Sequence, residues 1–451
     1  MTEGDPIPLT RRELAALALS VALVPLNSTM LAVAIPAIAK DLTVPSEVLT
    51  QALVASYLLV GIVLQSPGGK LGDGIGHGRA LGLGQIVFAI GSVVGFAGRS
   101  VLPLEIARGL MAAGGAVMVP SAFALVRTRA PASAQTKAFG AFSAVMGIAA
   151  AIGPLIGGEI VGRLGWPSLF AVNAPPVLLA ALLARSSVKE PKRPFPRFDL
   201  LGSALLGVGL VAAVLGLRSQ RFLVAAAGAG VLVLFFLWER RAKDPVIDPS
   251  LFKSRPFAAG VSVVGLQNLA MYGLLFALPI VLSRAFGADA KTSGRTLLAL
   301  TLAMVAGSMS SSRIVSRVGE RVCAICGSTI ALVGMLYVAA QTVRGASSLI
   351  PGLVLLGLGI GLSTPSVQAV AMAAVDRSRS GMAAGVSSTA RYLGGVIGVG
   401  VVSSFLHDSE PLAAHRSAAR LMACVLGAAL VASAMLPKVK SSPTAPRSPP
   451  R

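Results

Sequence analysis

A short, charged and glycine-rich segment, residues 69–79, contains the residues of this sequence that most clearly could have a chemical role. It separates two long apolar runs, residues 48–66 and 80–96, and contains a single carboxylate, Asp73. That carboxylate can accept hydrogen bonds from backbone N–H groups of the segment, or it can face the N-terminus of a helix from elsewhere in the fold. A contact that exists in only one conformation would favour that conformation. We predict a conformational switch formed by Asp73, Gly69, Gly76 and Arg79. The alternative is an aspartate that only stabilises a turn.

Two acids and an arginine lie inside apolar stretches. Glu105 and Arg108 are three residues apart, so they share one face of a helix and can form an ion pair. Ionisable groups within a membrane helix normally face the bundle interior or a water-filled cavity. An unpaired buried carboxylate could carry a proton, whereas pairing with Arg108 would keep it charged. We predict a proton or charge relay of Glu105, Arg108 and Glu159. Because both acids lie toward the outer ends of their spans, an interfacial carboxylate is an equally supported alternative.

Other polar side chains in apolar surroundings are candidates for a substrate cavity. Arg391 lies within an apolar run and would be expensive to bury alone, so it should face a cavity, backbone carbonyls or a carboxylate. Four further residues are expected to contact a small molecule there: Asn27, Gln267, Asn268 and Tyr272. Hydrogen bonding between helices explains each of them equally well.

Gly153 and Pro154 lie in a run of small residues, 147–158. Small residues let membrane helices approach closely, and proline removes the backbone hydrogen bond that keeps a helix straight. We predict that Gly153 and Pro154 allow this helix to bend during a conformational change. The alternative is an ordinary kinked helix that packs well.

The composition requires that these residues be positioned by membrane helices. Hydrophobic residues make up 54% of the chain, only 13% of residues are charged, and the mean hydropathy is +0.79. A soluble domain would carry about a quarter charged residues. Apolar stretches of the roughly 20 residues needed to cross a bilayer recur along the whole chain. The sequence therefore predicts an all-α polytopic membrane protein and excludes an enzyme built on a soluble domain.

The apolar runs predict fourteen spans arranged as six, two and six. The expected spans are 14–36, 47–66, 80–98, 103–125, 138–162, 167–184, 199–217, 221–238, 257–283, 292–312, 322–341, 347–371, 380–405 and 418–436. A weak repeat aligns residues 312–320 with 69–77, so that Gly319 corresponds to Gly76. This organisation predicts an N-terminal bundle over 1–185, loops with two extra helices over 186–256, a C-terminal bundle over 257–437, and a disordered basic tail over 438–451.

The distribution of basic residues predicts the orientation in the membrane. The net charge of +21 arises from Lys and Arg in short loops rather than from one basic face, which argues against a nucleic-acid partner. If the N-terminus is inside, the inner loops hold more than twice as many Lys and Arg as the outer ones, as the positive-inside rule expects. We therefore expect a bacterial inner-membrane protein with both termini in the cytoplasm. The first apolar run is too long for a cleavable signal.

Taken together, these features resemble the fourteen-helix drug:proton antiporter branch of the major facilitator superfamily. The resemblance spans nearly the whole chain. It rests on the segment 69–79 and on Tyr57-Leu58-Leu59, Arg108 with Gly114, Gly153-Pro154 with Gly157-Gly158, residues 166–170 with Asn173 and Pro175, and Arg391 with Gly394-Gly395. It implies two six-helix bundles with two additional central helices, and efflux of hydrophobic small molecules coupled to protons.

The chain departs from this family pattern at positions that matter for coupling. The first helix of drug exporters commonly has an Asp where this chain has Asn27, and tetracycline exporters have a Glu where it has Ser28. Neither side chain can release a proton at physiological pH, so proton coupling must use another carboxylate. The segment 69–79 also has Gly74 where a basic residue is common and His77 where Arg is common.

The sequence therefore predicts a secondary transporter that exports drugs or antibiotics by alternating access. Alternatives are an exporter of one endogenous metabolite or self-made antibiotic, and a non-transporting scaffold or sensor on the same fold. We expect no cofactor and no metal. Cys323 and Cys326 have CxxC spacing, but no His or second CxxC is nearby, so buried packing cysteines are expected. The oligomeric state is left open.

Overall fold

The computed structural model describes residues 9–44, 49, 52–53, 56–184, 199–218, 221–242, 245, 247–286, 290–341, 345–406 and 411–437. Its long helices are α1 (Arg11–Leu42), α3 (Ser56–Ile75), α4 (His77–Ala97), α5 (Val101–Arg129), α6 (Ala132–Leu164), α8 (Ala174–Ala184), α9 (Leu200–Arg218), α10 (Phe222–Glu239), α11 (Arg255–Phe286), α12 (Ala290–Val318), α13 (Glu320–Ala340), α14 (Ile350–Ala373), α15 (Ser380–Leu406) and α16 (Pro411–Ala434). Short helical turns are α7 (Ser168–Ala171), η2 (Pro249–Lys253), η3 (Ala346–Leu349) and η4 (Arg377–Arg379). No strand occurs among the described residues, so the predicted all-α class is confirmed.

Each of the fourteen predicted spans overlaps a helix of the structure. Within the described residues, eight helices are long and apolar enough to cross a membrane, and three shorter helices are also apolar. The count of fourteen stays a prediction. The predicted tail, 438–451, and most of the loop between the first six spans and the next two, 185–198, lie outside the described residues.

The segment 69–79, which the sequence suggested as a short connection between two helices, is almost entirely helical. α3 continues to Ile75 and α4 begins at His77, so only Gly76 interrupts the helical backbone. Gly76 has φ of +96°, a value that a residue without a Cβ adopts without steric strain. Gly319, its partner in the predicted repeat, separates α12 from α13 in the same way, with φ of +82°. The repeat is therefore a repeated one-residue helix break.

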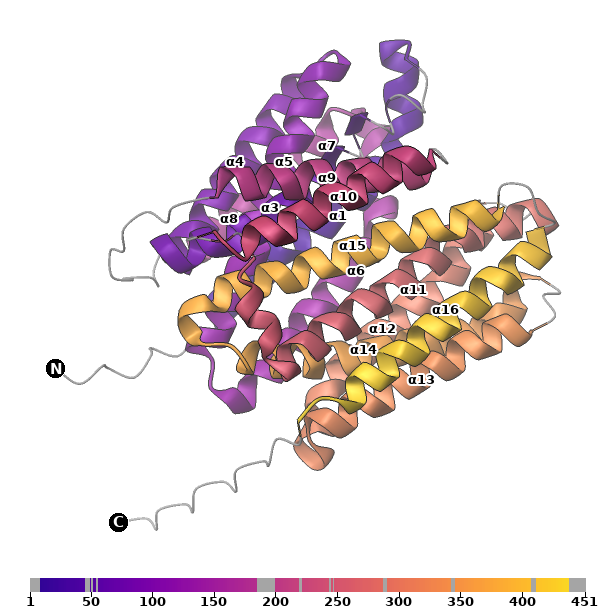
Figure 1. Ribbon diagram of the computed structural model, residues 1–451. Helices are drawn as coiled ribbons and strands as arrows, with labels where there is room; N and C mark the ends of the chain where they lie inside the picture. Colours follow the sequence, from indigo (N-terminus) through magenta and orange to yellow (C-terminus); the bar gives the residue numbers. More distant parts are fainter. Residues whose placement is uncertain are drawn as a thin grey trace, which may run out of the picture.

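Figure 1 shows two groups of helices, one from the N-terminal and one from the C-terminal part of the chain. In the N-terminal group α4 packs on α5, α1 on α6, and α3 on α5; in the C-terminal group α14 packs on α12 and α13, and α11 on α15 and α16. The groups meet where α15 contacts α3 and α5, and where α6 contacts α12 and α14. Four long helices of mixed origin, α3, α6, α12 and α15, therefore form most of the contact between the halves.

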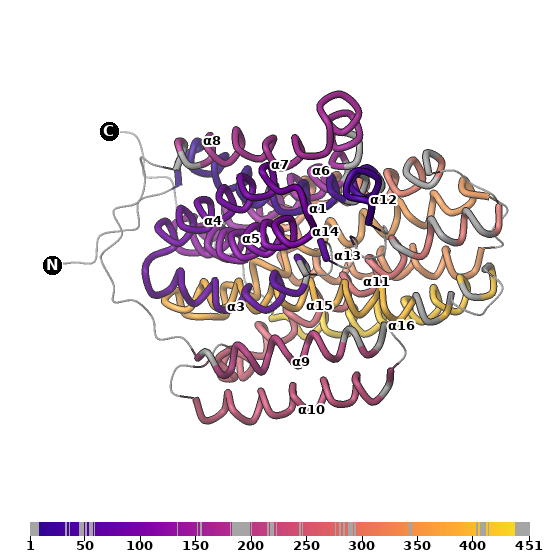
Figure 2. The backbone as a smooth tube through the Cα atoms, turned by 90° about the horizontal axis from the view of Figure 1, so that it is seen from above, coloured from indigo at the N-terminus to yellow at the C-terminus, as the bar shows by residue number. Residues whose placement is uncertain are grey.

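Helices α9 and α10 form a separate pair on the outside of the bundle. Figure 2 shows them side by side along one edge, and α9 contacts α3 and α15. Their large apolar side chains are exposed, including Leu223 at 87%, Val208 at 59% and Val233 at 57%. Exposure on this scale is stable only against lipid.

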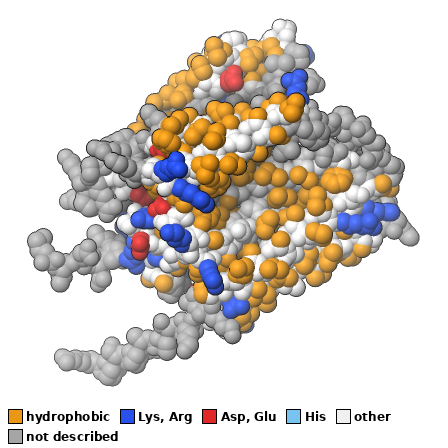
Figure 3. Space-filling model, viewed as in Figure 1, with side chains coloured by type: hydrophobic (Ala, Val, Ile, Leu, Met, Phe, Trp, Pro, Cys, Tyr) orange, Lys and Arg blue, Asp and Glu red, His pale blue; other side chains and the backbone are white. Residues whose placement is uncertain are grey.

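The distribution of apolar and basic side chains on the surface is typical of a membrane protein. Apolar side chains cover most of the face in Figure 3, while most of its Lys and Arg gather at the left end of the view. The cysteines differ from expectation: Cys323 is buried, but Cys326 and Cys424 are exposed. An apolar thiol is as stable toward lipid as toward the protein interior, so membrane burial does not require packing against other helices.

Candidate functional site

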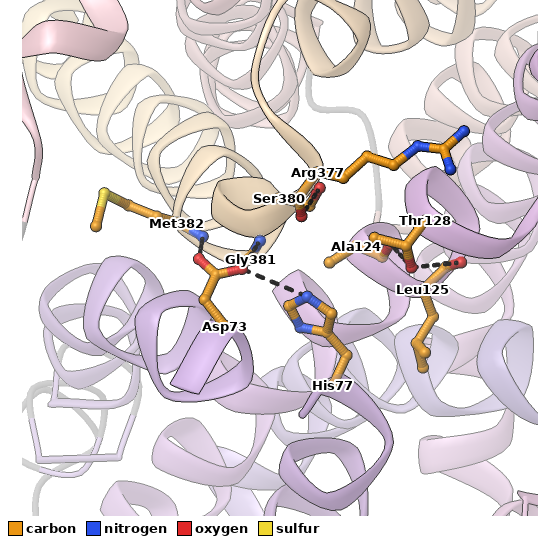
Figure 4. Close-up of polar contacts among 9 residues, drawn as sticks. All are labelled: Asp73, His77, Ala124, Leu125, Thr128, Arg377, Ser380, Gly381 and Met382. Carbon is orange, nitrogen blue, oxygen red and sulfur yellow. Dashed lines mark hydrogen bonds and ion pairs between the residues drawn. The ribbon is translucent and has the colours of Figure 1, made fainter. Parts of the chain in front are cut away.

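Asp73 joins the two halves of the molecule. Its Oδ1 accepts a hydrogen bond from the backbone N–H of Gly381, and its Oδ2 accepts one from Met382, both at 2.7 Å. These N–H groups belong to the first turn of α15, where no helical partner exists for them and the helix dipole is positive. Of the two roles that the sequence allowed for this carboxylate, the structure forms the contact with a helix from the other half (Figure 4).

His77 lies beside this contact. Its Nε2 is 3.4 Å from Asp73 Oδ1, across the helix break at Gly76. A protonated imidazole would form an ion pair with the carboxylate, whereas a neutral one could donate at most an uncharged hydrogen bond. Arg79 is exposed and donates from Nη1 to the carbonyl of Ile75 at 3.4 Å, which binds it to the end of α3.

The backbones of α3 and α15 touch at this point because neither helix carries a side chain there. A Cβ built on Gly69 would lie 2.0 Å from the carbonyl oxygen of Gly381, and one built on Gly385 would lie 2.5 Å from that of Gln65. Distances below 3.0 Å essentially never occur for real Cβ atoms. The glycines therefore set the close approach that lets Asp73 reach the N-terminus of α15.

A second link at the same end was not predicted from the sequence. Arg127 of α5 donates from Nε to the carbonyl of Met372 at 2.8 Å and from Nη2 to that of Ala373 at 3.3 Å. These carbonyls belong to the last turn of α14, where a cation is favourable. A basic residue at the end of α5 has no local feature that reveals this distant partner. The link borders a hollow of about 420 Å³ lined by Ser250, Ser254, Asp376, Arg377 and Arg379 among others.

Arg108 is fully buried in the N-terminal half, but its partner is not Glu105. Its Nε donates to the carbonyl of Leu53 at 3.0 Å, and its Nη1 donates to Asn27 Oδ1. Its guanidinium lies over the ring of Tyr57, 3.8 Å from the centroid. The helical spacing allowed a pair with Glu105, but the side chain instead turns toward α1 and α3. Glu105 is half-buried, and Glu159 is exposed and paired with Arg163 one turn away.

Arg391 lies where the halves meet. It is half-buried on α15 and its guanidinium is 5.9 Å from the ring centroid of Phe123, on α5 of the other half. Tyr272 of α11 packs against Gly395, one helical turn further along α15. Of the cavity residues predicted from sequence, Arg391 and Tyr272 thus lie near each other on α15 and α11, whereas Asn27 lies on α1 and binds Arg108.

The structure places the remaining predicted residues within one half. Gln267 Nε2 donates to Ser328 at 3.2 Å and to Ser363 at 2.9 Å, and Asn268 donates to the carbonyl of Val264 in its own helix. Gly153 packs on α1, where an added Cβ would lie 1.9 Å from Thr29 Oγ1. α6 runs through Pro154, whose side chain lies outside the described part of the structure.

Comparison with known proteins agrees with this architecture. Residues 17–399 match the family model described as the Major Facilitator Superfamily. The chain belongs to the major facilitator superfamily. It is 33% identical over 419 residues to the tetracenomycin C resistance and export protein of Streptomyces glaucescens. The aligned region covers 88% of this chain and 76% of that protein. It is 31% identical over 392 residues to the multidrug resistance protein Stp of Mycobacterium tuberculosis strain H37Rv, covering 84% and 73%.

The fold also matches solved structures of the superfamily. The human organic anion transporter MFSD10 superposes with a TM-score of 0.71, covering 94% of this chain and 99% of that one at 16% identity. At this low sequence identity, the structural similarity establishes only the fold. A member of the major facilitator superfamily is a multi-pass membrane transporter and not an enzyme, as the sequence predicted.

Proposed function

We propose that the protein exports hydrophobic small molecules, such as drugs or antibiotics, by alternating access across the bacterial inner membrane. The observation that carries the proposal is the contact of Asp73 with the start of α15. This contact can form only when the two halves are close together at that end. The relatives are named for drug resistance and export. The excess of Lys and Arg in the loops expected inside supports a cytoplasmic location for this closed end.

In this proposal the cytoplasmic gate has three parts. Asp73 binds the two N–H groups of α15, Arg127 binds the carbonyls of α14, and the glycine contact between α3 and α15 fixes their separation. Rotation of the halves to open the cytoplasmic side breaks all three. Gly153 and Pro154 allow α6 to adjust against α1 during the rotation. Each charge-assisted contact contributes about 1.5–3 kcal/mol, enough to shift the two-state equilibrium about ten- to a hundredfold.

The proposed export is tested by a susceptibility panel in an efflux-deficient bacterial host. Cells that express the protein are expected to tolerate at least fourfold more of one or more hydrophobic antibiotics than cells with an empty vector. A proton uncoupler should abolish the difference. Tolerance to a single compound class would favour a dedicated exporter of one metabolite or self-made antibiotic. No change in drug accumulation for any compound would favour a non-transporting scaffold or sensor.

Coupling to protons is part of the proposal, and Glu105 is the acid best placed to serve it. It is half-buried and one helical turn from Arg108, whereas Glu159 is exposed and paired with Arg163. Glu105→Gln is expected to eliminate transport driven by a pH gradient while substrate still binds. Glu159→Gln is expected to retain at least half of it. Substrate-induced proton movement in proteoliposomes measures both, and an unchanged proton-to-substrate ratio in the double variant would refute this account.

A further inference from the structure

The membrane spans contain two cations, one fully buried and one half-buried, for which the described residues provide no carboxylate. Arg108 is 0% exposed and is paired with a neutral amide, Asn27. Arg391 is half-buried and forms no ion pair among the described residues, where the four salt bridges all lie elsewhere. An isolated cation in this environment is strongly unfavourable, and it is stabilised by any anion that can approach it.

Both guanidinium groups retain hydrogen-bonding capacity. The Nη2 of Arg108 and the Nε of Arg391 are buried and have no hydrogen-bond partner in the described structure. Buried donors are rarely left unsatisfied, and each exception in a folded protein needs an explanation. A bound ligand that accepts these hydrogen bonds would explain why the donors have no partner within the protein.

Aromatic rings connect the two arginines across the interface of the halves. Tyr57 lies under Arg108, and Tyr392, the residue after Arg391, packs against the hydrophobic cluster that contains Tyr57. Arg391 in turn lies over Phe123, which stacks on Phe139 at 5.5 Å between ring centroids. Since Tyr272 packs against Gly395, one turn from Arg391, three of the four tyrosines in the chain lie in one cluster with Arg108 and Arg391. The cluster draws on α3 and α5 from one half and on α11 and α15 from the other.

From this juxtaposition we propose that the transported substrates are amphipathic organic anions, with an aromatic body and a carboxylate or comparable acidic group. The anionic group accepts charge-assisted hydrogen bonds from the guanidinium donors that have no partner. The aromatic body packs among the tyrosine rings and Phe123. A cationic compound would be repelled by two uncompensated positive charges, and a neutral one would leave these charges uncompensated. Transport of these anions rests on the proposed export function, whereas their binding to the protein does not.

Asn27 has a defined part in this proposal. An aspartate at this position would form an ion pair with Arg108 and neutralise it. The asparagine accepts one hydrogen bond from the guanidinium and leaves its charge available. The departure from the pattern of drug exporters that the sequence revealed at this position thus converts an internal ion pair into a binding site for an external anion.

The test compares three ligands that share one ring system: 2-naphthoate, neutral 2-naphthamide and (2-naphthylmethyl)trimethylammonium. Binding to the purified full-length protein is measured by equilibrium dialysis with radiolabelled probes. The wild-type protein is expected to bind naphthoate at least tenfold more tightly than naphthamide, and the ammonium compound most weakly. Arg391→Gln should weaken naphthoate binding at least tenfold without changing naphthamide binding, while Arg391→Lys should retain part of the preference.

Asn27→Asp provides an independent test that keeps every arginine in place. It should reduce naphthoate affinity at least tenfold and leave naphthamide affinity unchanged. The control is Arg317→Gln, an exposed arginine in the last turn of α12, which should bind all three probes as the wild type does. Absence of naphthoate binding, no preference for it over naphthamide, or unchanged binding in both Arg391→Gln and Asn27→Asp would overturn the proposal.

Transport of the same probes into proteoliposomes separates this inference from the proposed function. If naphthoate binds with the expected preference but none of the probes is transported, export is refuted and the anion site stands. If the ammonium compound is transported and naphthoate is not, export stands and the anion site is refuted.

Discussion

Export by the Asp73→Asn protein is expected to fall at least tenfold at matched protein levels. The carboxylate accepts one hydrogen bond on each oxygen from the first turn of α15. An asparagine can accept only one of them, and its NH₂ group would face the second donor. It also lacks the charge that the helix dipole stabilises. The contact between the halves then weakens, and the cytoplasmic side opens more often than the transport cycle requires.

Two measurements check this result. Efflux of a fluorescent substrate from preloaded cells gives the activity. The distance between spin labels at Lys137 and Arg377, exposed on opposite halves, gives the conformation and should lengthen in the variant. The control is Asp376→Asn, a carboxylate at the same end that makes no capping hydrogen bond. It should leave both readouts unchanged. Wild-type export by Asp73→Asn would exclude a gating role for this residue.

Gly381→Ala is expected to hold the cytoplasmic side open and to reduce export as severely. The added Cβ would lie 2.1 Å from the carbonyl oxygen of Gly69, 2.8 Å from the His77 ring and 2.9 Å from Asp73 Oδ1. Because the first of these atoms belongs to a backbone, α3 and α15 must separate by about 1 Å, which stretches the 2.7 Å bonds of Asp73 beyond hydrogen-bonding range.

The matched control is an alanine at Gly400, on the same helix, where an added Cβ meets nothing within 4 Å. Gly400→Ala should transport as the wild type does and keep the short distance between the labels at Lys137 and Arg377. If Gly381→Ala also keeps the short distance and full activity, the backbones of α3 and α15 do not approach as closely as described. Loss of activity in Gly400→Ala alone would point to a general intolerance of α15 to substitution.

Local sequence patterns were sufficient to predict the helices and several chemical groups. Hydropathy and span length depend only on neighbouring residues, so the positions of the helices, including the two extra ones, and the equivalence of Gly76 and Gly319 could be read from the chain. The sequence also identified Asp73 as a carboxylate able to bind the start of a helix from another part of the fold. It did not show that the segment 69–79 is helical on both sides of the single residue Gly76.

The tertiary structure alone decided which groups are partners. Asp73 and Gly381 are 308 residues apart, and Arg127 and Met372 are 245 residues apart, so no local spacing relates them. Arg108 shows the same limit within one half: spacing on α5 favoured Glu105, but packing of α1 and α3 against α5 turned the guanidinium toward Asn27 and Leu53. Helical periodicity fixes which residues share a face, whereas the partner across that face depends on how distant helices pack, and that is a property of the whole fold.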